Sequence, residues 1–348
     1  MILGVSVIIC TYNGVARLPE TLRYISQQQV HASIPWEVIV VDNASTDHTS
    51  EVVCQEWAKY QSNIPFSLYQ QPKPGLTFAR ELALEKAKYE FIIFCDDDNW
   101  LNPGYVELAY NIMLEHPSVG ALGGFGELVY EIEPPAWAAA LPLFANGKQA
   151  NVSGKVPRNA VYGAGCVVRK SAYNGVIEAG FRPMLSDRVA ANLSSGGDYE
   201  LCYALVLAGY DIWYDERLLF KHFMPKDRLQ WEYYLRFFKE RAKCFEVLVP
   251  YQLIINYGCI SDKSFTNKYF SLFMKFAKQT YPLLLNKMRF SPNSDKGKIT
   301  TLKLKALQLR LSSFGKFKTM KENHGTILKM KQEKLDGLSK SITLQPHQ

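Results

Sequence analysis

The stretch FIIFCDDD at residues 91–98 decides the fold, because five apolar residues end abruptly at three aspartates. A short, continuous apolar run is typical of a strand that is covered on both faces of a parallel sheet. The runs VSVIIC at residues 5–10 and EVIVV at residues 37–41 have the same character, and they end at Thr11 and Asp42. The sequence therefore predicts three buried strands that are each followed by polar side chains.

Segments with helical character separate these strands and lie at residues 19–29, 49–60 and 77–88, with a weaker strand at residues 66–69. Strand and helix alternate four times, which predicts an α/β fold with a doubly wound, mainly parallel sheet. Ligands of such sheets bind outside the carboxyl ends of the strands. We therefore expect Thr11, Asp42 and the three aspartates to converge on one crevice, although they are distant in sequence.

The pattern becomes less regular after residue 120. We expect strands at residues 123–130, 160–169 and 211–214, a helix at residues 197–208 and a long irregular segment at residues 131–160. Loops of that length in a compact domain are often lids or binding loops. Beyond residue 227 a mostly helical chain is predicted. The expected organisation is an α/β domain at residues 1–245 and a mainly helical, basic extension at residues 246–348, with a flexible last part.

The net charge of +7 is unevenly distributed. Residues 286–348 hold 14 Lys and Arg against 4 Asp and Glu, a balance of +10, whereas residues 1–285 hold 26 against 29, a balance of −3. A basic segment suits an anionic membrane surface or a polyanion, and it is equally compatible with a solvated appendage. The sequence alone leaves both interpretations open.

The seven cysteines are scattered, and no pair has the spacing of a metal-binding or redox motif. An odd, unpatterned set favours a reducing compartment. No stretch approaches the ~20 apolar residues of a membrane-spanning helix. The apolar start at residues 1–10 lacks the flanking features of a signal peptide, so we interpret it as a first strand. We expect a cytoplasmic protein.

Asp96, Asp97 and Asp98 form the strongest local indication of chemistry. Adjacent carboxylates repel one another, which is costly unless a cation neutralises them. Oxygen ligands suit Mg²⁺ or Mn²⁺ that bridges a diphosphate. A solvated acidic turn is the alternative, but the buried run directly before the triplet favours a metal.

Four further side chains are candidates whose positions alone do not decide their roles. His222 would complete a metal site begun by Asp98, or it would be a core residue with its hydrogen bonds satisfied. Asp198 follows two glycines and would act as a general base or cap a helix, with Glu200 as the second candidate base. Arg80 would contact the nucleotide or pair with a neighbouring acid.

Taken together, these features resemble the family 2 glycosyltransferases, which have the GT-A fold. The matching segments follow the family's order and cover roughly residues 4–245. They are residues 7–13, 40–47, 75–80, 96–98, 163–169 and 197–201, and His222. Each segment alone is weak, whereas the ordered set is specific. Two positions depart from the family's pattern. Many relatives have Asn at the position of Glu81, and many have an acid at the position of Gly197.

The resemblance implies a role for each position. Thr11, Asp42, Arg80, Asp96 and Asp97 would bind the nucleotide sugar, Asp98 and His222 would bind Mn²⁺ or Mg²⁺, and Asp198 would be the catalytic base. The donor would be a nucleotide-diphosphate sugar, with a UDP-sugar favoured. The acceptor would be a hydroxyl of a glycan or a lipid-linked oligosaccharide in surface polysaccharide or glycoconjugate synthesis. The reaction would invert the anomeric centre, and residues 1–245 would be the catalytic domain.

The acceptor side is less determined. Aromatic side chains at Trp137 and at residues 231–238 can stack on sugars, although such rings more often pack in a core. Residues 267–285 place Tyr269, Leu272, Phe273, Phe276 and Thr280 at helical spacing among lysines. A basic amphipathic helix can lie on a membrane surface, or it can pack on the catalytic domain. From the resemblance we expect peripheral contact with the cytoplasmic face of a membrane.

Other classes of protein fit the sequence less well. A sugar-nucleotide pyrophosphorylase would need a glycine-rich phosphate loop after the first strand, and a dehydrogenase would need Gly-x-Gly-x-x-Gly there. Residues 11–14 hold TYNG instead. A nucleic-acid partner is not expected, because only the basic tail favours one. The remaining alternative is a catalytically inactive nucleotide- or glycan-binding subunit on the same scaffold.

Overall fold

The computed structural model describes residues 2–141, 143–185 and 196–332. Within these ranges nine strands form one sheet, in the order β3-β2-β1-β4-β8-β6-β9-β5, and β7 also pairs with β9. The strands are β1 (Ile2–Thr11), β2 (Trp36–Asp42), β3 (Phe66–Gln70), β4 (Tyr89–Phe94), β5 (Asn99–Leu101), β6 (Val119–Tyr130), β7 (Gly154–Lys155), β8 (Val167–Arg169) and β9 (Asp211–Met224).

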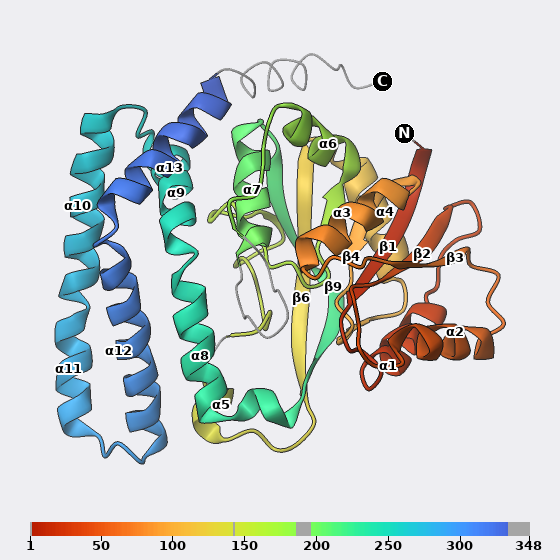
Figure 1. The fold of residues 1–348 in the computed structure, drawn as a ribbon, viewed down its shortest axis with the longest axis horizontal. Helices are drawn as coiled ribbons and strands as arrows, with labels where there is room; N and C mark the ends of the chain where they lie inside the picture. The colour runs from red at the N-terminus through yellow and green to blue at the C-terminus, as the bar shows by residue number, and fades with distance from the viewer. Residues whose placement is uncertain (1, 142, 186–195, 333–348) are drawn as a thin grey trace.

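Helices flank this sheet and form a separate layer beside it (Figure 1). They are α1 (Leu18–Ser26), α2 (Thr49–Lys59), α3 (Leu76–Lys86), α4 (Tyr105–Glu115), α5 (Ala136–Ala139), α6 (Lys170–Glu178), α7 (Gly197–Leu207), the 3₁₀ helix η1 (Lys226–Leu229), α8 (Trp231–Ala242), α9 (Phe245–Tyr257), α10 (Asp262–Lys278), α11 (Thr280–Arg289), α12 (Asp295–Ser313) and α13 (Phe317–Met330). None of the helices in the described part of the chain is long and apolar enough to cross a membrane.

The sheet is parallel in its first half and mixed beyond it. β1 pairs in parallel with β2 and β4, and β2 pairs in parallel with β3. β8 is antiparallel to both β4 and β6, while β6 runs parallel to β9. The doubly wound α/β architecture predicted from the alternating strands and helices is confirmed.

Helices cover both faces of the sheet because alternate residues of a strand point to opposite sides. Val5, Val7 and Ile9 of β1 lie in a buried cluster with α1, α2 and α4. Ile8, between them, lies in a second cluster with α3, α6 and α7. All four side chains are at most 1% exposed, which explains why this strand is continuously apolar.

The C-terminal helices extend the core. α9 starts at Phe245 and packs against α7 and α13. Val247, Leu248 and Tyr251 of α9 belong to the same buried cluster as α3 and α7. The region beyond residue 245 is helical, as expected, up to the last described residue. Residues 333–348, where we expect a flexible end, lie outside the described residues.

One strand was predicted too long and another too short. Of the strand expected at residues 160–169, only Val167–Arg169 is a strand, because residues 160–166 form a loop that brings the Gly163 amide to Asp198. The strand expected at residues 211–214 continues as β9 to Met224. Pairing with β6 and β5 extends β9 past His222, so that the histidine lies on the sheet.

Candidate active site

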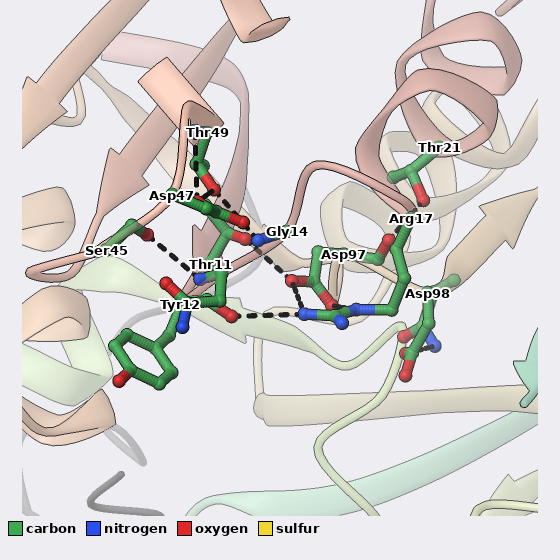
Figure 2. A network of polar contacts seen from close by, with 12 residues as sticks. Thr11, Tyr12, Gly14, Arg17, Thr21, Ser45, Asp47, Thr49, Asp97 and Asp98 are labelled. Atoms are coloured by element: carbon green, nitrogen blue, oxygen red, sulfur yellow. Dashed lines mark hydrogen bonds and ion pairs between the residues drawn. The ribbon is translucent and has the colours of Figure 1, made fainter. Parts of the chain in front are cut away.

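The carboxyl ends of β1, β2 and β4 meet at one edge of the sheet, as the parallel topology requires. Thr11 and Asp42 are register partners at the ends of β1 and β2. The Thr11 hydroxyl donates a hydrogen bond of 2.6 Å to Oδ2 of Asp97, so the acidic triplet lies beside the first strand (Figure 2). The structure therefore brings together groups that are up to 86 residues apart in the chain.

Asp42 holds the turn that follows β2. Its Oδ1 accepts from the backbone N–H of Ser45 at 3.1 Å, and its Oδ2 accepts from the Ser50 hydroxyl at 2.5 Å. The N–H of Asn13 donates to Oγ of Ser45 at 2.9 Å, which ties the turn after β1 to the turn after β2. A carboxylate offers about four lone-pair sites. Asp42, although only 7% exposed, therefore retains acceptor capacity for a ligand.

Asp97 is locked between β1 and the start of α1. Arg17 donates to both carboxylate oxygens, through Nε at 2.9 Å and Nη2 at 2.8 Å, in the bidentate geometry that guanidinium favours. The Thr21 hydroxyl donates to the Asp97 carbonyl at 2.8 Å. Figure 2 shows Asp97 between Thr11 and Arg17, with Asp98 to one side. The resemblance implies that Asp97 binds the nucleotide sugar. Its hydrogen-bond partners favour a different role, in which Asp97 positions the triplet.

Asp97→Asn is expected to lower the free energy of unfolding by about 1–3 kcal/mol, because it removes the charged acceptor of Arg17 in a mostly buried setting. Urea-induced unfolding measures this loss. Asp215→Asn is the matched control, since Asp215 also pairs with an arginine through two hydrogen bonds, but Arg217 is 66% exposed. That control is expected to cost less than about 1 kcal/mol. Equal losses in both variants would refute the locking role of Asp97.

Asp98 faces the opposite side of the site, toward β9 and η1. Its Oδ1 lies 3.5 Å from Nε2 of His222, and its Oδ2 lies 2.8 Å from Nη1 of Arg228. Asn99, the β5 partner of His222 on β9, donates to Oδ1 of Asp98 at 3.1 Å. The two residues that the resemblance assigns to the metal are therefore neighbours, and pairing of β5 with β9 makes them so.

The geometry around His222 fits a divalent cation. Nδ1 of His222 lies 2.7 Å from the Phe144 carbonyl oxygen, so in the neutral ring Nδ1 carries the proton and the Nε2 lone pair faces Asp98. Metal-binding histidines commonly donate their second nitrogen in this way. Two ligands about 2.1 Å from one cation can be up to about 4.2 Å apart, which accommodates the spacing between Asp98 and His222.

These two side chains would not complete a metal site alone. The described residues contain no group of three or more His, Cys, Asp or Glu that could hold a metal. Mg²⁺ usually keeps several waters and is held by one or two carboxylates together with substrate phosphates. Asp98 and His222 therefore suit a metal that is bound jointly with a diphosphate.

Asp96 and Arg80 lie near the end of β1 as well. Burial raises the pKa of the Cys10 thiol to about 12, Arg80 opposes this shift, and Asp96 and Asp97 add to it. All three charged groups are thus close enough to act on Cys10, the residue before Thr11. The Arg80 guanidinium, on α3, also lies 5.1 Å from the centre of the Phe94 ring at the end of β4.

Asp198 begins α7 and lines a pocket between α7 and α3 together with Arg80, Gly163 and Phe94. Its Oδ2 accepts a hydrogen bond of 2.8 Å from the Gly163 amide. A Cβ at Gly163 would lie 3.3 Å from Cβ of Asp198 and 3.5 Å from Nη2 of Arg80. Glycine therefore permits the close approach of a carboxylate and a guanidinium at this pocket, whose remaining lining is mostly apolar.

Glu200, the second candidate base, has a structural role instead. Its side chain is fully buried, and its two oxygens accept from the backbone N–H groups of Met184 and Leu185, both at 2.9 Å. A carboxylate used in this way is not available to an acceptor hydroxyl. This geometry favours Asp198 over Glu200 as the base.

The aromatic residues expected near the acceptor side mostly pack. Trp137 is 4% exposed and makes edge contacts with Trp231 and Tyr234, and Leu302 of α12 completes this cluster. The alternative that these rings form a core is confirmed for Trp137 and Tyr234.

Sequence reasoning missed Arg17 and Arg228, which pair with Asp97 and Asp98. Nothing in the local pattern distinguishes either arginine from a surface residue. The one available signal was that Arg228 closely follows His222, on the segment that leaves β9.

The fold and the site define a domain of the GT-A type, with an acidic triplet at the carboxyl edge of a doubly wound sheet. Residues 6–174 match the model of Glycosyl transferase family 2. The solved structure of a mannosyltransferase, PcManGT from Pyrobaculum calidifontis in complex with GDP-Man and Mn²⁺, has the same fold, with a TM-score of 0.57 and 18% identity over 90% of this chain and 88% of that one. Residues 6–174 are therefore similar in sequence to the family 2 glycosyltransferases.

Relatives in sequence match a limited part of the chain. Poly(ribitol-phosphate) beta-N-acetylglucosaminyltransferase TarS of Staphylococcus aureus is 33% identical over 113 residues, which are 32% of this chain and 19% of TarS. Hyaluronan synthase of Pasteurella multocida is 32% identical over 122 residues, which are 34% of this chain and 12% of the synthase. The matched segments thus span a fifth or less of these relatives' own length.

Proposed function

We propose that the protein is an inverting glycosyltransferase that moves a hexosyl or N-acetylhexosaminyl group from a nucleotide-diphosphate sugar to a hydroxyl of a glycan or lipid-linked oligosaccharide. The observation that carries this proposal is the pairing of Asp98 with His222 at 3.5 Å, and the pocket that Asp198 lines together with Arg80 supports it. TarS, named a poly(ribitol-phosphate) beta-N-acetylglucosaminyltransferase, supports transfer of an N-acetylhexosaminyl group to a polymeric acceptor. The Mn²⁺ in complex with the mannosyltransferase supports a divalent cofactor.

In this proposal Asp98 and His222 hold Mn²⁺ or Mg²⁺, which when bound neutralises charge on the diphosphate leaving group. Asp42 binds the nucleoside base beside Thr11, Asp96 binds the ribose side, and Arg80 faces the nucleotide. Asp97, held by Arg17, fixes the triplet. Residues 1–245 would form the catalytic domain.

In this proposal Asp198 is the general base of the sugar-transfer step. Asp198 removes the proton from the acceptor hydroxyl as that oxygen attacks the anomeric carbon, opposite the bond to the diphosphate. A glycosidase must protonate a poor leaving group. A nucleoside diphosphate leaves without that help, so one carboxylate suffices. The single displacement inverts the anomeric centre, and much of the rate gain comes from holding donor and acceptor in line.

Nucleotide binding tests whether the donor is a nucleotide-diphosphate sugar that binds together with a divalent cation. We would measure the unfolding temperature with UDP, GDP and dTDP, with and without Mn²⁺. One nucleotide at about 100 times its Kd is expected to raise Tm by roughly 5 °C in the presence of Mn²⁺ and much less in its absence. No stabilisation by any of the three would contradict a nucleotide-diphosphate donor. Stabilisation without turnover would favour the inactive binding subunit.

We also propose that α10 and α11 contact an anionic membrane surface. The predicted amphipathic face of this region, with Tyr269, Phe273 and Phe276, packs inward against α12 and α13. The opposite face is also apolar, and its side chains are 46–86% exposed: Phe270, Met274, Tyr281, Leu284, Leu285 and Met288. α10 and α11 form the outer edge of the helical layer in Figure 1.

Charge favours a lipid surface over a second copy of the chain. Residues 262–289 hold six Lys or Arg and one Asp, a balance of +5. Two such faces would repel each other, whereas anionic lipid attracts each basic residue near its surface by about 1 kcal/mol. Exposed apolar side chains among basic residues are typical of helices that lie in a membrane interface.

Vesicle flotation tests this contact. The protein is expected to float with vesicles that contain phosphatidylserine and to stay in solution with phosphatidylcholine alone. Tyr281→Glu combined with Met288→Glu is expected to weaken flotation about tenfold, because it places two acids on the apolar face. Val152→Glu changes a side chain that is 73% exposed elsewhere and should float like the unchanged protein. Undiminished flotation of the double variant would exclude this face.

A further inference from the structure

The carboxylate assigned to the metal already has a buried cationic partner. Nη1 of Arg228 lies 2.8 Å from Oδ2 of Asp98, and the two side chains are 15% and 4% exposed. Arg228 belongs to η1, a single turn that directly follows β9 and precedes α8. Arg228, which neutralises Asp98, therefore follows the end of β9, and His222 lies near that same end.

A divalent cation and Arg228 would compete for Asp98. The cation would bind between Asp98 and His222, within a few ångströms of the guanidinium, and like charges repel strongly in a setting with so little water. Arg17 holds Asp97 through two nitrogens, whereas the pair of Arg228 with Asp98 joins Nη1 to Oδ2. Because the cation would bind to Asp98, the pair of Arg228 with Asp98 is the one that cation binding would open.

The chemistry of guanidinium indicates where Arg228 would go. Its planar fork of N–H groups matches phosphate oxygens as well as it matches a carboxylate. A donor diphosphate that shares the cation with Asp98 and His222 would bring such oxygens to this point. A buried charge that loses one partner needs another, because leaving it unpaired is costly.

We propose that Arg228 neutralises Asp98 before the cation binds and then binds the donor diphosphate when the cation takes its place. This inference rests on the proposed function, because it requires a donor that carries a diphosphate. It assigns to Arg228 two opposite effects: opposition to the cation alone and support of the nucleotide that comes with it. A purely structural arginine would not produce these two opposite effects together.

Metal and nucleotide binding to the full chain test the inference without any measurement of turnover. Mn²⁺ affinity in the absence of nucleotide would be measured by electron paramagnetic resonance of the free ion, and UDP affinity at saturating Mn²⁺ by calorimetry. Arg228→Gln is expected to bind Mn²⁺ alone about fivefold tighter and UDP about tenfold weaker, because one positive charge is removed from both sites. Arg217→Gln, an exposed arginine on β9 paired with Asp215, is the control and should change neither affinity.

Arg228→Lys covers the case in which the glutamine variant does not fold. Lysine keeps the charge but has no fork, so Mn²⁺ affinity should stay within about twofold of the original while UDP binds more weakly. Unchanged or weaker Mn²⁺ binding in Arg228→Gln, or unchanged UDP binding in both variants, would overturn the inference. Failure of the unchanged protein to bind Mn²⁺ and any nucleotide diphosphate would instead overturn the proposed function, and this inference with it.

Discussion

Replacing Asp198 with Asn is expected to lower kcat of sugar transfer by about 10²–10⁴-fold, the usual contribution of a positioned general base. The amide oxygen can still accept from the Gly163 N–H, so the start of α7 should keep its conformation. Nucleotide affinity should stay unchanged, because the variant removes proton transfer and leaves the donor contacts in place. Nucleoside diphosphate release at saturating donor and acceptor measures kcat, and calorimetry with UDP and Mn²⁺ measures affinity.

Glu200→Gln is the matched control for the base, since it alters a carboxylate two residues away on the same helix. The glutamine would present an NH₂ group to one of the two backbone N–H donors of Met184 and Leu185, and stability should fall. Its kcat should remain within about tenfold of the original in the folded fraction. A Glu200→Gln variant that keeps its Tm but loses activity, beside an active Asp198→Asn, would reverse the assignment of the base.

Asp98→Asn is expected to weaken Mn²⁺ binding at least about 10²-fold and to lower kcat/KM by about 10²–10³-fold, because the charged ligand of the cation is lost. Raising the Mn²⁺ concentration should restore part of the activity. A titration of nucleoside diphosphate release against Mn²⁺ gives both values. Asp215→Asn, at a carboxylate that pairs with Arg217 away from the site, should follow the original titration curve. Equal Mn²⁺ dependence in Asp98→Asn and the original would exclude Asp98 as a ligand.

Much of the fold could be predicted because its central strands are buried on both faces. The runs at residues 5–10, 37–41 and 91–95 all lie in β1, β2 and β4 or directly at their ends. A continuous apolar run carries this information locally. The loop at residues 160–166 could not be distinguished from a strand, since its conformation depends on the hydrogen bond from Gly163 to Asp198, 35 residues away.

The candidate site could likewise be predicted from the sequence only in part. The order of the motifs led to Asp98, His222 and Asp198, and parallel strands explain why Thr11 and Asp42 lie together. The partners of the triplet were not predictable, because Arg17 and Asp97 are 80 residues apart and only the fold makes them meet.

The basic helical region shows a further limit. Residues 267–285 carry apolar side chains on two faces, and the sequence pattern singled out the face that contains Tyr269 and Phe276. Packing against Phe314 buries or half-buries that face, which leaves Phe270 and Tyr281 exposed on the other. Which of two apolar faces meets solvent depends on the neighbouring helices.

The central claim is that this site transfers sugar from a nucleotide-diphosphate donor, and donor turnover tests it most directly. The purified protein would be incubated with Mn²⁺ and a panel of UDP-, GDP- and dTDP-sugars, with Asp98→Asn and Asp198→Asn in parallel, and nucleoside diphosphate release would be measured. We predict release from one donor, which requires Mn²⁺ and which both variants reduce. Release that is independent of metal and of both aspartates, or binding of a donor with no release even with glycan acceptors present, would contradict the account.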